Sequence, residues 1–221
     1  MTKIVPSKAD IALLAPFEGL ELVHIHVPTS IEEFATASAD IKSAALVGFD
    51  TESKPTFVTG EVSDGPHVVQ FALRNKAYLF QLHYPEAIPF LVELLQSKEL
   101  IKVGFGLKSD SRQSFSKLGV RLNGVVDLNT IFSMDGYRKE MGVRSAVGLV
   151  LNQRILKSRH VTTSNWSQRQ LSSQQILYAA NDAYAALKVF ETLGLALDKL
   201  PIMGLNKLTS DNSAESDHFS E

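Results

Sequence analysis

Short runs of apolar residues, bounded by polar turns and glycines, recur through the central part of the chain and predict β-strands. The run at 44–49 is continuously apolar, which is typical of a strand buried on both faces. The runs at 67–73 and 76–82 are separated by two residues and predict a hairpin. Three further predicted strands are an alternating stretch at 21–27 and short apolar runs at 100–104 and 125–127.

Apolar residues at helical spacing, together with helix-capping signals, predict the helices. Ser30 and Glu33 match the S-x-x-E capping box, and Ser172 and Gln175 form a second box that fixes the start of the last helix. The predicted helices cover residues 31–41, 88–95, 110–118, 144–152 and 173–196.

A hairpin joined to alternating strands and helices predicts an α/β protein with a mixed sheet and helices packed on it. We expect one domain over residues 21–200. Residues 1–20, which contain Pro6 and Pro16, are expected to be irregular. Residues 201–221 are acidic and contain few apolar residues, so we expect a disordered acidic tail.

The composition narrows the class of protein. With 221 residues, 44% of them hydrophobic, the chain is long enough for one domain with a substantial core. The absence of cysteine excludes disulfides, thiolate zinc sites and cysteine nucleophiles. A net charge of −2 excludes a strongly basic protein. Because the sequence shows neither a long apolar stretch nor a secretory signal, we expect a cytoplasmic protein with no membrane partner.

Carboxylates at strand ends are the first candidate chemical groups. Asp50 and Glu52 lie two residues apart at the end of the first buried strand, so both side chains point to the same face. Two close carboxylates repel each other unless a cation lies between them, and such hard oxygen ligands suit Mg²⁺ and Mn²⁺. Taken alone, the pair is more often the solvated end of a strand.

Three further acids have equally simple alternatives. Tyr178 and Asp182 are four residues apart on the last predicted helix and so share one face, and the alanines around them allow a close approach to another element. Asp110 stands near a predicted helix N-terminus, where a plain cap is the alternative. Asp127 ends a short strand and is a rival ligand that its spacing does not select.

Three segments together resemble the exonuclease motifs of the DEDD superfamily. They are GFDTES at 48–53, KVGxxLKxD at 102–110 and YAANDAY at 178–184. Tyr178 is typical of the DEDDy subgroup, whereas the DEDDh subgroup has a histidine where this chain has Leu177. The sequence is most similar to ribonuclease D and to the exonuclease domain of the Werner syndrome protein, over about residues 20–197.

The resemblance implies a ribonuclease H-like (DnaQ-like) fold with a five-stranded mixed sheet flanked by helices. It also implies 3′–5′ exonuclease activity with two divalent cations, Mg²⁺ or Mn²⁺. By their motif positions, the metal ligands would be Asp50, Glu52, Asp110 and Asp182. Asp50 would bridge the two metals, Asp110 would serve the metal near the leaving 3′-oxygen, and Tyr178 would position the attacking water.

A basic stretch precedes the last of these motifs. Residues 141–181 contain five Lys and Arg and no Asp or Glu, whereas the rest of the chain has 17 basic and 24 acidic residues. We expect Arg144, Lys157 and Arg159 to contact phosphates, and a solvated basic face is the alternative. Trp166 and Phe57 are expected to serve packing rather than base stacking.

The resemblance therefore implies a metal-dependent phosphodiester hydrolase that acts on 3′ ends of DNA or RNA and releases nucleoside 5′-monophosphates. No obligatory protein partner is expected. One alternative is an inactive nucleic-acid-binding module on the same fold, and another is a polymerase proofreading subunit. The presence of all four acids with Tyr178 favours the active, stand-alone enzyme.

Overall fold

The computed structural model describes residues 3–56, 60–61, 63–156 and 159–204, without the side chain of Arg159. Phe57, Lys157 and residues 205–221 lie outside the described part, so what the sequence predicts for them stays a prediction. None of the helices in the described part has the length and apolar character that crossing a bilayer requires.

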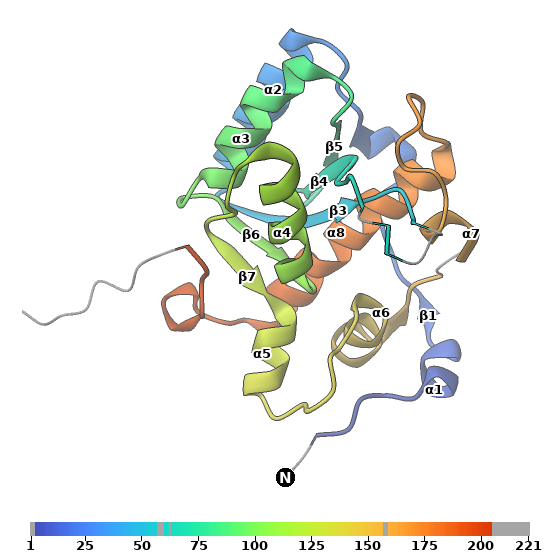
Figure 1. Cartoon of the computed structure of the whole chain (residues 1–221). Coiled ribbons are helices and arrows are strands. Elements are labelled where there is room, and N and C mark those ends of the chain that lie inside the picture. The colour runs from blue at the N-terminus through green and yellow to red at the C-terminus, as the bar shows by residue number, and fades with distance from the viewer. Residues whose placement is uncertain (1–2, 57–59, 62, 157–158, 205–221) are drawn as a thin grey trace, which may run out of the picture.

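A mixed sheet of six strands forms the centre of the molecule (Figure 1). Strand β3 (Leu46–Glu52) lies between the antiparallel hairpin β4 (Val68–Ala72) and β5 (Ala77–Gln81) on one side and the parallel strands β6 (Ile101–Gly104) and β7 (Val125–Asp127) on the other. These five strands confirm the hairpin and the mixed sheet, and the two-residue β2 (Ile25–His26) adds a sixth beside β5. The carboxyl ends of β3, β6 and β7 meet at one end of the sheet, which is where α/β proteins carry their ligand sites.

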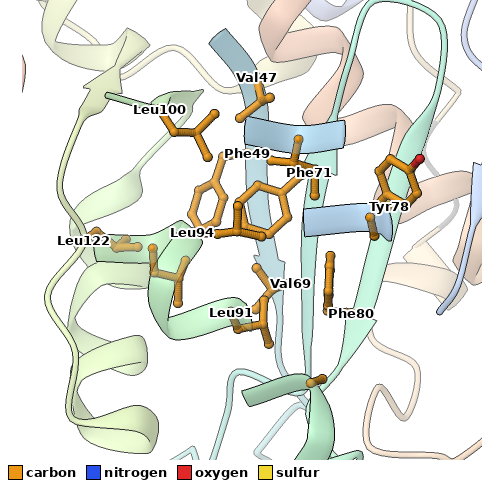
Figure 2. Close-up of a cluster of buried hydrophobic side chains, with 14 of the residues drawn as sticks. Val47, Phe49, Val69, Phe71, Tyr78, Phe80, Leu91, Leu94, Leu100 and Leu122 are labelled. Carbon is orange, nitrogen blue, oxygen red and sulfur yellow. The ribbon is translucent and has the colours of Figure 1, made fainter. Parts of the chain in front are cut away.

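Helices cover both faces of the sheet (Figure 1). On one face lie α2 (Ile31–Ser43), α3 (Ile88–Gln96) and α4 (Leu107–Leu118), and on the other lies the long α8 (Ser173–Leu193). Figure 2 shows the first interface, where Phe49 and Phe71 of the sheet meet Leu91 and Leu94 of α3. Successive residues of a strand point to opposite faces, so Gly48, Asp50 and Glu52, which alternate with Phe49, face α8.

The prediction of a strand along the whole of residues 21–27 is wrong. Leu22–His24 form a 3-10 turn, η1, and among the described residues this stretch pairs with β5 only at Ile25 and His26. Leu22 and Val23 are 42% and 74% exposed. An alternating pattern becomes a strand only where a neighbour can accept its backbone hydrogen bonds and cover its apolar face.

The helices largely follow their capping signals. Both hydrogen bonds of the Ser172–Gln175 capping box are present, and α8 ends at Gly194 with φ +60°. The first predicted box forms only by half, because Ser30 accepts from the Glu33 N–H while the Glu33 carboxylate accepts from the Thr29 N–H instead.

Several short elements surround this frame. The predicted helix at 144–152 is α6 (Val143–Ala146) followed by the π-helical segment η3 (Val147–Leu151). The sequence pattern did not predict the remaining short helical elements, which are η2 (Pro85–Ala87), α5 (Leu128–Met134), α7 (Arg159–Thr162) and η4 (Leu197–Lys199).

Both ends of the described chain are more ordered than the sequence pattern predicts. A Ser7–Asp10 capping box starts α1 (Lys8–Ala12), and β1 (Ala15–Pro16) pairs in parallel with β8 (Gln153–Arg154), so the prediction of an irregular segment is wrong there. At the other end Met203 pairs with Val125 of β7. Residues 201–204 therefore extend the fold and are not part of a tail.

Candidate active site

Three carboxylates from two elements converge at the carboxyl end of β3. Asp50 and Glu52 come from β3, and Asp182 comes from α8. One oxygen from each carboxylate can be chosen so that all three lie within 4.8 Å of one another. The structure thus brings together three of the four acids that the motifs predict as metal ligands.

The close approach of α8 to β3 makes this cluster possible. A Cβ atom built on Gly48 would lie 1.9 Å from the carbonyl oxygen of Ala183, so helix backbone touches strand backbone there. Ala179, Ala180 and Ala183 are fully buried along the same face of the helix. Small residues on both sides therefore place Asp182 beside Asp50, as the alanine-rich sequence of this helix predicts.

Asp110 reaches the site from the other face of the sheet. It lies in the first turn of α4, which follows β6, and its side chain is buried. The hydroxyl of Thr51, which stands between Asp50 and Glu52, donates a hydrogen bond of 2.5 Å to Asp110 Oδ1. Asp110 is thus linked to the cluster through Thr51 and is not one of the three carboxylates grouped within 4.8 Å.

Burial and mutual repulsion make the charged form of the cluster costly. The pKa of Asp50 is raised well above its ordinary value, first by burial and then by the negative charges of Asp110, Glu52 and Asp182. Burial also raises the pKa of Asp110, although the hydrogen bond from Thr51 opposes this. A divalent cation would remove both penalties, and carboxylate oxygens are the ligands that Mg²⁺ and Mn²⁺ prefer, so the donor set fits such an ion.

Asp127, the rival ligand, has a structural role. Its carboxylate accepts hydrogen bonds from the backbone N–H groups of Gly106 at 3.1 Å, Leu107 at 3.0 Å and Asn129 at 3.0 Å. It therefore caps the starts of both α4 and α5, which fixes the helix that carries Asp110. The pattern of a strand followed by Asp and an apolar helix could have identified this cap.

Tyr178 lies one helical turn before Asp182 on α8. Both residues line a hollow of about 420 Å³, here called the tyrosine hollow, together with Leu20, Leu177 and Arg154 among others. The ring of Tyr178 packs against Trp166, with centroids 5.9 Å apart. Trp166 is fully buried, which confirms that it serves packing, and it supports the tyrosine from behind.

A second hollow also borders the carboxylates. Asp50 and Asp182 line a smaller hollow of about 200 Å³ with Phe105, Val143 and Ala186. Asp182 thus borders two hollows, so groups of a substrate can approach the cluster from either of them.

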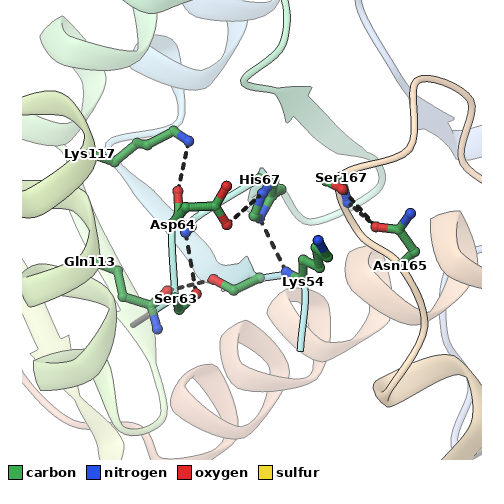
Figure 3. A network of polar contacts seen from close by, with 10 residues as sticks. Lys54, Ser63, Asp64, His67, Gln113, Lys117, Asn165 and Ser167 are labelled. Atoms are coloured by element: carbon green, nitrogen blue, oxygen red, sulfur yellow. Dashed lines mark hydrogen bonds and ion pairs between the residues drawn. The ribbon is translucent and has the colours of Figure 1, made fainter. Parts of the chain in front are cut away.

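The loop after β3 is anchored by a network that the sequence did not indicate (Figure 3). Ser53 donates to Gln113 of α4 at 2.5 Å, and the Lys54 N–H donates to His67 Nδ1 at 3.1 Å. Lys117 of α4 donates to the carbonyl oxygen of Asp64 at 2.7 Å. These contacts fix the chain directly after Glu52 against α4.

Of the predicted phosphate contacts, the structure describes one side chain. Arg144 is exposed on α6 and lines a third hollow, described below, with Lys8 and Arg154. Lys157 lies outside the described residues, and Arg159 is described only as part of α7.

Comparison with known proteins decides the family. Residues 25–198 match the family model described as 3′-5′ exonuclease. The chain belongs to the 3′–5′ exonuclease family. Exonucleases of this family use divalent metal ions, which agrees with the acidic cluster.

Two relatives of the chain are named as 3′-5′ exonucleases. The mouse bifunctional 3′-5′ exonuclease/ATP-dependent helicase WRN is 31% identical over 172 residues, which are 77% of this chain and 12% of the mouse protein. A 3′-5′ exonuclease of Arabidopsis thaliana is 30% identical over 159 residues, which are 70% of this chain and 54% of the plant protein. The chain thus spans only part of each of these relatives.

Solved structures show the same fold. The EXO domain of Nibbler from Aedes aegypti has a TM-score of 0.67 and 21% identity, and covers 78% of this chain and 88% of that domain. RNase D from Escherichia coli has a TM-score of 0.65 and 17% identity, and covers 77% of this chain and 44% of RNase D. The chain therefore has the ribonuclease H-like fold of RNase D-like domains, which confirms the predicted fold class.

Proposed function

We propose that the chain is a metal-dependent 3′–5′ exonuclease that removes nucleoside 5′-monophosphates one at a time from the 3′ end of DNA or RNA. The observation that carries this proposal is the convergence of Asp50, Glu52 and Asp182 within 4.8 Å, beside a hollow that Tyr178 lines. Membership in the 3′–5′ exonuclease family supports it.

Asp50, Glu52 and Asp182 would hold divalent ions, Mg²⁺ or Mn²⁺, with Asp110 contributing from the Thr51 side. When bound, a pair of such ions supplies positive charge to both the attacking and the leaving oxygens of a phosphodiester. Burial and the neighbouring carboxylates raise the pKa of Asp50, and a bound cation would relieve both effects, which supports this assignment.

The protein groups around the cluster orient the reacting atoms. The hydroxyl of Tyr178 would hold and orient the attacking water, and a bound metal ion would supply the acidification of that water. Trp166 holds the ring, and Thr51 holds the carboxylate of Asp110.

The substrate class follows from charge and from relatives. A nucleic acid is a polyanion, and the acid-free stretch at 141–181, which ends directly before Asp182, carries five Lys and Arg residues. We assign Arg144, Lys157 and Arg159 to phosphate contacts on this ground. A solved structure of RNase D from Trypanosoma brucei, which shares this fold, is a complex with RNA U12.

The reaction and its direction are tested with the purified chain alone. A single strand labelled at its 5′ end is incubated with Mg²⁺ or Mn²⁺, and a circular strand of the same length serves as the control without ends. We expect a ladder that shortens by one nucleotide per step, an intact circle, and no reaction in EDTA. Cleavage of the circle, or undiminished cleavage in EDTA, would refute the proposal.

A further inference from the structure

A groove runs from the acidic cluster to a basic hollow beside the N-terminal segment. The basic hollow has a volume of about 470 Å³ and is lined by Lys8, Ile11 and Ala12 of α1 and by Arg144 and Ser145 of α6. Arg154, Ile155 and Leu156 line both this hollow and the tyrosine hollow. The two hollows therefore adjoin at these three residues, and together they are here called the groove, with Arg154 at their junction.

Residues 7–20, here called the N-terminal strap, form one wall of this groove. Phe17, Gly19 and Leu20 line the tyrosine hollow, and Lys8 and Ile11 line the basic hollow. Figure 1 shows α1 and β1 beside α6, although these elements lie far apart in the sequence. A segment that the sequence pattern left without a role thus contributes to the surroundings of Tyr178.

The strap is fixed to α8, the helix that carries Tyr178 and Asp182, by the side chain of Asn181. Asn181, the neighbour of Asp182, accepts from the Leu20 N–H at 2.6 Å and donates to the Leu20 carbonyl oxygen at 3.0 Å. A Cβ atom on Gly19 would lie 2.2 Å from Asn181 Oδ1, so the contact requires glycine there. The groove is therefore preformed in this structure, which lowers the entropy that binding costs.

Further bonds tie the strap to β8 at the junction of the hollows. The Phe17 N–H donates to the Arg154 carbonyl oxygen at 2.9 Å, and Arg154 Nη1 donates to the Ala12 carbonyl oxygen at 2.5 Å. The guanidinium of Arg154 is thus held in place between the two hollows.

The charges in the groove fit a phosphate chain. Lys8, Arg144 and Arg154 line the basic hollow, and none of the described residues that line it is acidic. Asp10 lies on the same short helix, but its carboxylate accepts hydrogen bonds from the N–H and hydroxyl of Ser7. In the tyrosine hollow, apolar side chains such as Phe17, Leu20 and Leu177 accompany Asp182, which suits a base and sugar next to the reacting phosphate.

We propose that this groove binds a single, unpaired strand of nucleic acid, with one nucleoside in the tyrosine hollow and the phosphate of a neighbouring nucleotide in the basic hollow. Lys8, Arg144 and Arg154 are its phosphate contacts, and the N-terminal strap is a substrate-binding element. The volumes of both hollows lie in the range of about 300–1,000 Å³ that holds one small ligand each, which favours an unpaired strand. The proposal rests on the proposed function for the identity of the ligand.

Binding is tested separately from hydrolysis. A 5′-fluorescein-labelled oligothymidylate of 12 nucleotides is titrated with the protein in EDTA, and fluorescence anisotropy gives the affinity at several salt concentrations. The test variant is Lys8→Gln/Arg144→Gln, in which both side chains are exposed. The matched control is Lys98→Gln/Arg121→Gln, which removes the same charge from exposed positions at the amino ends of β6 and β7.

We expect the test variant to bind about tenfold more weakly and its log–log salt slope to fall by about 1.4, or 0.7 for each lost contact, with the control unchanged. Equal binding by the test variant and the wild type would overturn the inference, as would equal losses in test and control variants. If the test variant loses affinity as expected but the wild type has no nuclease activity, the inference stands and the proposed function is refuted. If the wild type is an active nuclease but the test variant binds as tightly as the wild type, the proposed function stands and the inference is refuted.

Discussion

At the scale of single residues, α8 carries two tyrosines whose hydroxyl groups have different surroundings, one beside the candidate site and one in a structural hydrogen bond. Tyr178 borders the tyrosine hollow with Asp182 and packs on the buried Trp166. Tyr184 lies further along the same helix, and its hydroxyl donates to the carbonyl oxygen of Arg74 at 3.2 Å. Replacing each tyrosine by phenylalanine therefore removes the same hydroxyl group, and only the loss at Tyr178 is expected to affect catalysis.

We predict that Tyr178→Phe lowers kcat about 10²-fold, because the substitution removes only the hydroxyl that orients water. Stabilisation by Mn²⁺ in a thermal melt is expected to persist, since the carboxylates are untouched. Tyr184→Phe should keep the wild-type rate. Near-normal turnover by Tyr178→Phe would remove this residue from the mechanism.

Lys102 is a second residue with a distinct chemical environment. It is fully buried in β6, and its ammonium donates to the carbonyl oxygens of Leu94 at 3.0 Å, Ser97 at 3.0 Å and Leu100 at 2.8 Å. Burial lowers the pKa of Lys102 to about 7. The three hydrogen bonds to backbone carbonyl oxygens give this lysine a structural role.

This pKa predicts how stability varies with pH. Below pH 7 the lysine is charged in both the folded and the unfolded chain, whereas between about 7 and 10.4 it is charged mainly in the unfolded chain. Unfolding then takes up a proton, so the free energy of unfolding should rise by up to about 2 kcal/mol from pH 7 to pH 9. Urea titrations of the wild type and of Lys102→Met measure this, and the rise should disappear in the variant. A flat profile in the wild type would contradict the assignment.

At the scale of elements, the contact of α8 with β3 sets the geometry of the site. Gly48 lets the helix backbone approach the strand, and the approach brings Asp182 to Asp50 and Glu52. A methyl group at Gly48 must displace the carbonyl group of Ala183, which cannot move without its helix.

We predict that Gly48→Ala destabilises the protein by about 3 kcal/mol or more, because overpacking against backbone exceeds the usual cost in a core. Nuclease activity should fall further than stability alone explains, since the helix carries Asp182. Gly142→Ala is the control, because a Cβ there meets nothing within 4 Å and φ is −69°. A wild-type melting temperature for Gly48→Ala would contradict the described helix contact.

Local patterns predict the elements that depend on local interactions. The hairpin follows from two apolar runs around a two-residue turn, and α8 follows from its Ser172–Gln175 capping box. The strand predicted at 21–27 fails because pairing depends on how far β5 extends beside it. The N-terminal strap could not be predicted, because the hydrogen bonds that fix it join Leu20 to Asn181, which lie 161 positions apart in the sequence.

In the candidate site, too, the sequence predicts some residues, whereas the roles of others depend on contacts between distant elements. The three motifs predict four ligand carboxylates, and the structure confirms that those from the first and last motifs, Asp50, Glu52 and Asp182, cluster. The position of Asp127 before an apolar helix indicates its local role as the cap of α5. Its bonds to the start of α4 depend on the packing of β7 beside β6 and could not be predicted. Thr51, which holds Asp110, also needs the packing of α4 against β3 to be recognised.

At the scale of the whole molecule, the net charge of −2 is not spread evenly, because acidic groups gather in the carboxylate cluster and basic groups line the groove. Burial and the repulsion between neighbouring carboxylates raise the pKa of Asp50, and both destabilise the charged site in the folded chain when no cation is bound. Divalent ions would therefore bind the folded chain in preference to the unfolded one, and binding of this kind raises stability.

We predict that Mn²⁺ at about 100 times its Kd raises the melting temperature of the wild type by about 5–10 °C. Asp50→Asn should melt higher than the wild type in EDTA, because one of the repelling charges is gone, and should gain little from Mn²⁺. Differential scanning fluorimetry with and without metal gives both values. A full Mn²⁺ response in Asp50→Asn would place the metal elsewhere.

The central claim is that the carboxylate cluster performs the hydrolysis of a 3′-terminal phosphodiester. Its most direct test is the single-turnover rate of release of the terminal nucleotide in Mn²⁺ for the wild type, Asp182→Asn and the surface control Asp135→Asn. The account predicts a loss of about 10³-fold for Asp182→Asn, because a ligand carboxylate becomes a neutral amide, and a wild-type rate for the control. A rate for Asp182→Asn within tenfold of the wild type would contradict the account.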